Sequence, residues 1–358
     1  MPYPISAMPM VFLLSLCTWM GYTAPLWAEK GPEQTTNAAF CKPGEYRADG
    51  HGIVGDSFSD PDYRVKKSEK WQKQPIRYGQ WAKGADLALT LDQHLYAALT
   101  PIVARFAKQQ GIEIVLKEGT CGVSQGLLNR KRVDLAGFCC PPAKTDRLPG
   151  LTFHTLSISS LAIVASVKNP IENLTQKQVR DIFQGHISDW GQIKGYQSGH
   201  LNNHAVWPVG RLHCTIRPGH WRRILADENL FSPRLDEAGS IPEMIQKVGR
   251  YPNAVGYEVL WDVIQFGGPK NPVKVLKVDG LHPNDDQALI EGRYPFYRTH
   301  SIAIWTPEAG QNPHAKALIT YLNDNLSTLP KKFHLISSNR LRKAGWNFRG
   351  EELIGTPK

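Results

Sequence analysis

Residues 119–142, GTCGVSQGLLNRKRVDLAGFCCPP, constrain the fold of this chain more than any other stretch. An alternating apolar segment precedes it at 112–118 and a second apolar segment lies within it at 133–138, so both are predicted to be strands. Between them, Val123 and Leu127 recur at helical spacing. A strand, a glycine-containing turn, a helix and a second strand usually place the two strands parallel in one sheet, which predicts an α/β fold.

The turn of this unit brings unusual chemistry to a position that favours ligands. It contains Thr120, Cys121 and Gly122 at the start of a helix, where backbone N–H groups and the helix dipole suit an anion. Cys139 and Cys140 end the next strand. Both strand ends open at the same edge of the sheet, where open α/β sheets bind ligands, so we expect these residues around one ligand site.

The composition is that of an ordinary soluble globular protein, with 21% charged and 41% hydrophobic residues. The net charge of +10 either solubilises the surface or attracts anions. The basic residues are scattered and no nucleic-acid recognition motif is present, so nucleic acid is not an expected partner. We expect a monomer.

The N-terminus predicts export. Residues 10–28 are apolar but too short and interrupted for a stable membrane span, which indicates a signal peptide (residues 1–28) cleaved after about Ala28, although no Lys or Arg precedes it. The mature protein should then be periplasmic or secreted, where disulfides form. An odd number of cysteines remains after cleavage, so at least one is not paired within the chain: Cys41, Cys121, Cys139, Cys140 and Cys214.

The rest of the chain alternates strands and helices. Residues 29–83 are predicted to be a loop-rich extension, and a strand at 85–90 leads to a helix at 94–110 that Thr90 and Asp92 can cap. Further strands are predicted at 161–167, 205–210, 273–278 and 299–306, and further helices at 173–185, about 218–226, about 240–248 and 314–326. The pattern divides near residues 161–169. This predicts one lobe at 84–165, completed by about 290–345, a second lobe at 166–289, and a cleft between them.

The second half of the sequence resembles the periplasmic phosphate-binding proteins of ABC transporters. The resemblance is carried by four segments in the family's order: NPIENLTQKQVRDIFQGHISDWGQI, PVGR, NAVGYEVL and GRYPFYRTHSIAIWT. It covers roughly residues 85–326. It implies a two-lobed, Venus-flytrap solute-binding protein that closes on its ligand and delivers it to a membrane permease without bond chemistry of its own.

The family's anion contacts are matched only in part. Thr120 keeps a hydroxyl in the segment that aligns with the family's Ser-Gly-x-Gly turn, and Arg211 matches the family's arginine. Cys139 takes the position of an aspartate that, in the family, accepts a proton from the bound phosphate. The loop with Thr90 and Asp92 lacks the usual Gly-Ser-rich turn. The Ser-Gly-Thr that follows the arginine is also missing, since the chain there includes His213, Cys214 and Thr215.

Cysteines therefore occupy three of the family's ligand loops. Thiolates are poor partners for phosphate oxygens and good ligands for soft ions, so the sequence favours Zn²⁺, Cu⁺ or a trivalent metalloid as ligand. The metal ligands would be Cys121, Cys139, Cys140 and Cys214. The alternative is disulfide bonding, for example of Cys121 to Cys139 or Cys140, or of Cys41 to Cys214.

Four functions remain open from the sequence. The favoured one is a binder of a soft metal ion, a metalloid or a thiophilic oxyanion that requires no other cofactor. The second is a binder of phosphate or another tetrahedral anion, held by Arg211, Thr120 and Thr215, with paired cysteines. The third is an enzyme with Cys139 or Cys140 as nucleophile and His213 as base, for which no carboxylate that orients the base is evident. The fourth is a sensor that signals to a membrane kinase instead of supplying an ABC permease.

Overall fold

The computed structural model describes residues 60–197, 204–212, 220–226 and 228–357, which all belong to one compact unit, Arg47–Lys358. The predicted signal peptide, Cys41, and the three neighbours His213, Cys214 and Thr215 lie outside the described residues. Among the described residues, no helix combines the length and apolar character needed to cross a membrane.

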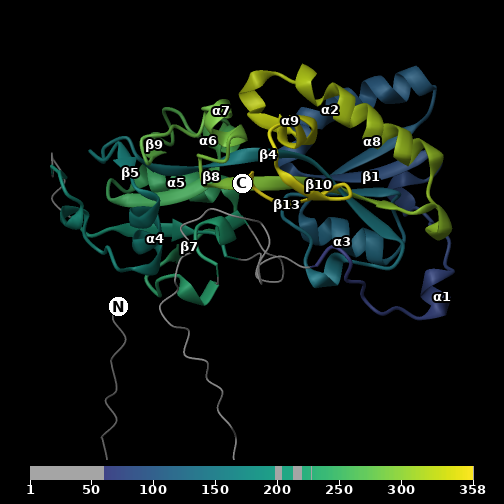
Figure 1. The fold of residues 1–358 in the computed structure, drawn as a ribbon, viewed down its shortest axis with the longest axis horizontal. Helices are drawn as coiled ribbons and strands as arrows, with labels where there is room; N and C mark the ends of the chain where they lie inside the picture. Colours follow the sequence, from purple (N-terminus) through teal and green to yellow (C-terminus); the bar gives the residue numbers. More distant parts are fainter. Residues whose placement is uncertain (1–59, 198–203, 213–219, 227, 358) are drawn as a thin grey trace, which may run out of the picture. The chain divides into compact units, whose positions relative to one another are not determined.

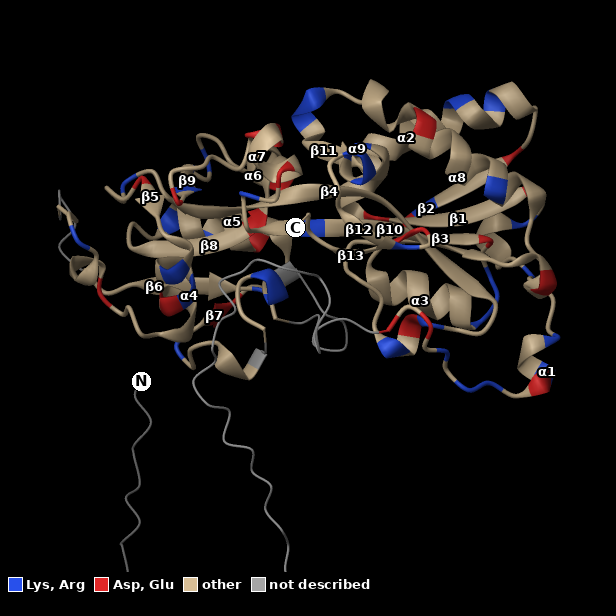
Figure 2. Ribbon diagram, in the orientation of Figure 1, with Lys and Arg blue, Asp and Glu red and all other residues tan. Residues whose placement is uncertain are grey.

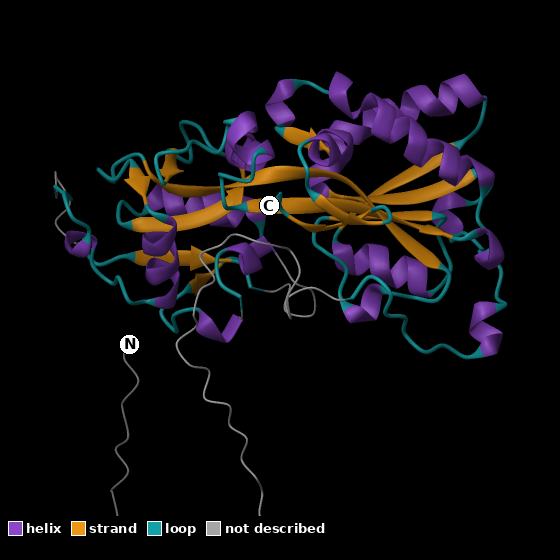
Figure 3. Ribbon diagram, in the orientation of Figure 1, coloured by secondary structure: helices purple, strands orange, loops and turns teal. Residues whose placement is uncertain are grey.

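Strands and helices alternate through most of the described chain (Figures 1 and 3). The strands are β1 (Leu87–Asp92), β2 (Ile114–Gly119), β3 (Leu135–Phe138), β4 (Leu151–Ser166), β5 (Asn173–Leu174), β6 (Trp207–Gly210), β7 (Asp236–Glu237), β8 (Ala254–Val259), β9 (Val273–Val278), β10 (Tyr297–Trp305), β11 (Leu335–Ser337), β12 (Asn347–Arg349) and β13 (Glu352–Gly355). The α-helices are α1 (Glu69–Gln72), α2 (Gln93–Gln110), α3 (Cys121–Asn129), α4 (Gln176–Gln184), α5 (Ile241–Arg250), α6 (Leu260–Phe266), α7 (Asp286–Ile290), α8 (Pro313–Asn325) and α9 (Ser338–Lys343).

The predicted parallel unit is present. β1 pairs in parallel with β2 on one side and with β3 on the other, so β1 lies between the two strands expected from the sequence. Helices α2 and α8 cover one face of this part of the sheet and α3 covers the other (Figure 1). Leu95 and Leu99 of α2 pack with Leu318 of α8 in one core, and Leu128 of α3 packs with Phe138 in another. We call these elements, with the N-terminal part of β4 and β10, the first half.

Strand β4 is longer than the sequence predicted. Its N-terminal part pairs with β10 in an antiparallel register that runs from Leu151↔Trp305 to Ser160↔Tyr297, and its C-terminal part pairs with β8. Only the second part was predicted, because the first contains His and several Ser that look like surface residues. Ser157 and Ser159 are buried, because this part of β4 is paired with both β10 and β11.

The second half of the molecule is built by α4, α5, β6, β8 and α6 with the C-terminal part of β4. The core around α5 is confined to these elements, whereas the core around α4 also takes in Ile158 of β4, Tyr297 of β10 and Ile336 of β11. Helix α4 follows the prediction: Thr175 caps its N-terminus with Gln178 in a capping box, and Gly185 ends it at φ 85°. The prediction of a helix at about 218–226 is wrong for the described part of this segment, which forms a 3₁₀ turn at His220–Arg223. Its apolar residues supply only about one turn before polar residues follow at 228–229.

Two segments read as loops, or left unassigned, carry structure. In the extension, Trp71 lies in the short helix α1 and donates its indole N–H to the backbone carbonyl of Asn129. At the C-terminus, strands β12 and β13 pair with each other. The side chain of Thr155 on β4 accepts a hydrogen bond from the backbone of Leu353, which holds this hairpin against the main sheet.

Candidate ligand site

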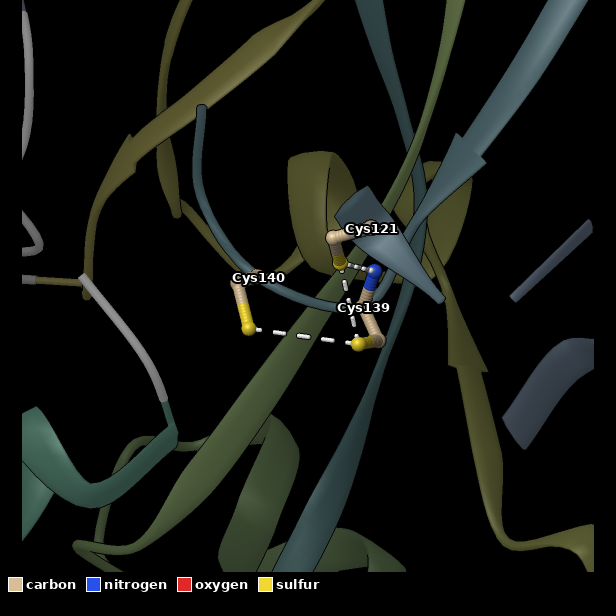
Figure 4. A group of neighbouring side chains, drawn as sticks. All are labelled: Cys121, Cys139 and Cys140. Atoms are coloured by element: carbon tan, nitrogen blue, oxygen red, sulfur yellow. Dashed lines mark hydrogen bonds between the residues drawn. The ribbon is translucent and has the colours of Figure 1, made fainter. Parts of the chain in front are cut away.

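The three described cysteines of the predicted site meet between α3 and the end of β3 (Figure 4). The Sγ atoms of Cys121 and Cys139 lie 3.2 Å apart, and those of Cys139 and Cys140 lie 3.9 Å apart. Neither distance is that of a disulfide bond, which is about 2.05 Å. All three side chains are buried, with exposures of 4%, 7% and 0%. The sulfurs lie within 4.8 Å of one another and could share one ion.

The local hydrogen bonds favour a negative charge on Cys139. Cys121 and Cys140 act as hydrogen-bond donors to its sulfur, and with Arg298 they hold the pKa of Cys139 well below its usual range although burial acts in the opposite direction. The same interaction with Cys139 raises the pKa of Cys121 well above its usual value, and burial adds to this effect. The directions of these two shifts favour loss of a proton from Cys139 before Cys121.

The hydroxyl groups predicted to bind an anion have other partners. The Oγ1 atom of Thr90 lies 2.9 Å from the Oγ atom of Ser124 in a buried hydrogen bond. The Oγ1 atom of Thr120 caps α3 by accepting from the backbone N–H of Val123. Gly122 is exposed in the first turn of that helix. Both hydroxyls therefore already make hydrogen bonds within the protein.

Asp92 ends β1 and begins α2. Its Oδ1 accepts from the backbone N–H groups of His94 and Leu95 at 3.0 and 3.3 Å, which confirms the predicted capping role. Its Oδ2 is buried and has no hydrogen-bond partner among the described residues. Burial and the neighbouring Cys139 raise the pKa of Asp92 to about 7. The donor atoms of Asp92, His94 and Cys139 lie within 4.8 Å of one another, so Cys139 belongs to two groups of donors.

A set of buried charged residues, which the sequence did not predict, adjoins the cysteines. The Nδ1 of His94 lies 2.5 Å from the Oδ2 of Asp262, and its Nε2 contacts the Nη1 of Arg298. Burial and Arg298 act to lower the pKa of His94, but Asp262 and Cys139 outweigh them and raise it to about 10. His94 comes from α2 in the first half and Asp262 from α6 in the second, so the site joins the two halves.

The predicted anion ligand Arg211 is already paired with a carboxylate. It lies just after β6, is 4% exposed, and its Nη1 contacts the Oε2 of Glu258 on β8. The Nη1 of Arg298 lies 3.9 Å from the Oε1 of Glu258. Burial raises the pKa of Glu258, but Arg211 and Arg298 outweigh it and hold the pKa below its usual value. One signal for this group was visible: Glu258 and Arg298 are charged residues within apolar strands, where a charge needs a partner.

A large surface cavity lies elsewhere. It has a volume of about 640 Å³ and is lined by Phe153, His154, Arg147 and residues of α8 and the C-terminal hairpin. None of the predicted ligand residues that the structure describes lines it. The three cysteines lie instead in a packed core of the first half.

The two halves pack mainly around different cores and are connected by shared strands and by buried polar groups, which is the arrangement of two-lobed ligand-binding proteins. Residues 85–325 match the PBP superfamily domain, about two thirds of the chain, so the chain belongs to the PBP superfamily. This match confirms the predicted fold class and the resemblance stated from the sequence, while the exact lobe boundaries stay a prediction.

Solved structures agree with this fold. An ABC-type phosphate transport receptor from Vibrio cholerae is 17% identical with a TM-score of 0.52, and the match covers 74% of this chain and 100% of that one. A putative phosphate ABC transporter substrate-binding protein from Clostridium perfringens, with bound phosphate, is 15% identical with a TM-score of 0.56, covering 70% and 98%. No curated protein matches the sequence.

Proposed function

We propose that this protein is an exported solute-binding protein that captures a soft metal ion or metalloid with thiolates and delivers it to an ABC-type membrane permease. The observation that carries the proposal is the buried group of three sulfur atoms where α3 begins and β3 ends, in a core of the first half. Thiolates are the ligands that soft ions prefer, and three sulfur atoms within reach of one ion can supply them. The predicted signal peptide supports export, and the description of two structural relatives as phosphate-transport proteins supports a permease as partner.

The spacing of the sulfurs suits a single ion. A tetrahedral ion with metal–sulfur bonds of about 2.3 Å holds its sulfurs about 3.8 Å apart. The Cys139–Cys140 separation of 3.9 Å already matches this value, and the Cys121–Cys139 separation of 3.2 Å would widen by about half an ångström on loading. Loading would release thiol protons, and the nearby Arg298 lowers the cost of the resulting negative charge.

Phosphate is the competing ligand, because two structural relatives are described as phosphate proteins. The contacts of this chain support it less well. The hydroxyls of Thr90 and Thr120 are used in other hydrogen bonds, and the charge of Arg211 is neutralised by Glu258. A thiolate at Cys139 would also repel a phosphate dianion.

The test is calorimetric titration of reduced protein with Zn²⁺, Cd²⁺, arsenite and phosphate. We expect at least one thiophilic ligand to bind with micromolar affinity or better, and Cys139→Ser to weaken it at least 100-fold. Cys41→Ser is the matched control, since we do not expect Cys41 in the site, and it should leave the affinity unchanged. Tight phosphate binding that Cys139→Ser does not alter would refute the proposal.

Oxidation supplies a second check on the same site. Cys121 and Cys139 are close enough to form a disulfide after a small movement, which would remove two of the three sulfur ligands. Mass measurement of alkylated protein with and without reductant counts the thiols. We expect ion binding only in the fraction whose thiols are reduced.

A further inference from the structure

The Oδ2 atom of Asp92 is an unsatisfied buried acceptor. Asp92 is fully buried, its Oδ1 is fixed by two backbone N–H groups at the start of α2, and its Oδ2 has no hydrogen-bond partner among the described residues. A buried carboxylate oxygen in this situation is costly unless a proton or a cation meets it. The helix cap holds the carboxylate in place, so Oδ2 is fixed in position before any ligand arrives.

The position of Asp92 relates it to the cysteines. It is the last residue of β1, the strand between β2 and β3, and it pairs with Gly119 one residue before the turn that leads to Cys121. On the other side, β3 leads directly into Cys139. A carboxylate oxygen of Asp92 lies within 4.8 Å of the Sγ atom of Cys139, which in turn lies within 4.8 Å of the other two sulfurs. The carboxylate and the sulfurs therefore open at the same edge of the sheet.

Other nearby donors already have neighbours. The two ring nitrogens of His94 contact Asp262 and Arg298, and the hydroxyl of Thr90 is bonded to Ser124. An ion at the sulfurs would have to break one of these buried contacts to use either side chain. The Oδ2 of Asp92 can coordinate an ion without breaking any hydrogen bond.

We infer that Asp92 supplies a fourth ligand, an oxygen, to an ion held by Cys121, Cys139 and Cys140. This inference rests on the proposed function and specifies its substrate class: a divalent ion of tetrahedral preference, such as Zn²⁺ or Cd²⁺. The four donors are drawn onto one centre when the ion binds, with Cys139 as the residue common to both donor groups.

A fourth, oxygen ligand discriminates between soft ions. Zn²⁺ and Cd²⁺ complete a tetrahedron with it and gain from its charge. Cu⁺ is satisfied by two or three sulfurs and gains little from a hard oxygen. A trivalent metalloid bound by three thiolates carries a lone pair on the face that the carboxylate would occupy. The site therefore prefers the divalent ions to the other two classes.

Asp92→Asn tests the role of this oxygen. Asparagine caps helices as well as aspartate does, so its side-chain oxygen can keep the hydrogen bonds of Oδ1 while an amide replaces the charged Oδ2. We expect the affinity for Zn²⁺ and Cd²⁺ to fall at least tenfold in a chelator-competition titration, and the affinity for arsenite and Cu⁺ to stay within about twofold. Thermal unfolding of the ion-free variant reports whether the fold is kept.

A direct readout needs no variant. X-ray absorption of the wild-type protein loaded with Zn²⁺ should show three sulfurs and one oxygen in the first coordination shell. A shell of sulfur alone, or equal Zn²⁺ affinity in the wild type and Asp92→Asn, would overturn the inference and leave the proposed function standing. If the wild type binds none of Zn²⁺, Cd²⁺, Cu⁺ and arsenite under reducing conditions, both the proposed function and this inference are wrong.

Discussion

Single buried charges decide much of the behaviour of this molecule. Glu258 is fully buried and faces both Arg211 and Arg298, so its carboxylate compensates two cations that no solvent reaches. The sequence alone marked Arg211, by resemblance, and missed its partners. A pattern of apolar strands locates a charged residue but does not show which distant strand supplies the opposite charge.

Glu258→Gln should destabilise the protein by about 3–5 kcal/mol, because it removes the charge of the buried carboxylate that faces two buried guanidinium groups. The free energy of unfolding in urea measures this. Glu172→Gln is the matched control: that carboxylate also pairs with a cation, Lys274, but its side chain is 74% exposed. The control should change stability by about 1 kcal/mol or less. Equal effects of the two variants would contradict the assigned role of Glu258.

His300 should make the protein sensitive to acid. Burial lowers the pKa of His300 well below its usual value, and the neighbouring His94 and Arg298 lower it further although Cys139 opposes them. Its Nε2 lies 2.8 Å from the Oγ of Ser159. Because the folded state keeps His300 neutral while the unfolded state takes up a proton below pH about 6.5, this contribution to stability is present above that pH and is lost as the pH falls.

We expect His300→Gln, which can keep the hydrogen bond to Ser159, to reduce the loss of unfolding free energy between pH 7 and pH 5. The difference should reach roughly 1.4 kcal/mol per pH unit below pH 6.5, the value for one proton. Urea titrations at several pH values measure it. Parallel stability curves for the wild type and the variant would show that His300 does not titrate between the two states.

At the scale of elements, the sequence predicted those whose ends carry their own signals. Helix α4 has a capping box at Thr175 and a terminal Gly185, and strand β9 is rich in valine, with two lysines among its six residues. The N-terminal part of β4 carries no such signal because its polar residues are buried beside the distant β10, and β12 and β13 are too short and polar to show one. Local chemistry predicts an element, but only the assembled sheet explains its polar residues.

Thr175→Ala should lower the free energy of unfolding by about 1 kcal/mol, since it removes the hydroxyl that accepts the backbone N–H of Gln178. Thr175→Ser keeps that hydroxyl and should cost clearly less. Both are compared by urea denaturation. The assignment of the cap would be wrong if the alanine and serine variants were equally stable.

At the scale of the whole molecule, the predicted convergence of three cysteines is confirmed, whereas ligand binding by them stays a prediction. Cys121, Cys139 and Cys140 converge as expected, because strand order places their loops at one edge of the sheet. The role of Cys214 stays a prediction, since it lies outside the described residues. The contact of His94 with Asp262 was not predictable, because it depends on how the halves close on each other.

Lys and Arg are distributed over both halves (Figure 2).

The contact between His94 and Asp262 should favour the closed arrangement of the two halves. Asp262→Asn removes the carboxylate that faces the imidazole, so we expect faster amide exchange in α6 and at the start of α2, and a larger radius of gyration in X-ray scattering. Glu243→Gln, which alters a partly exposed ion pair within α5, is the control. Unchanged exchange and scattering in Asp262→Asn would show that other contacts hold the halves together.

The 16-residue strand β4 runs through both halves, and β10 accompanies its N-terminal part with a register shift between His300 and Ser301. A ladder that is continuous in this way can bend but cannot be pulled apart without losing many backbone hydrogen bonds. Any widening of the junction would therefore concentrate its strain at that bulge, two residues from Arg298. The same flexing that admits a ligand would carry the guanidinium away from His94 and Glu258, so that entry of a guest and disassembly of the buried charge network become a single event.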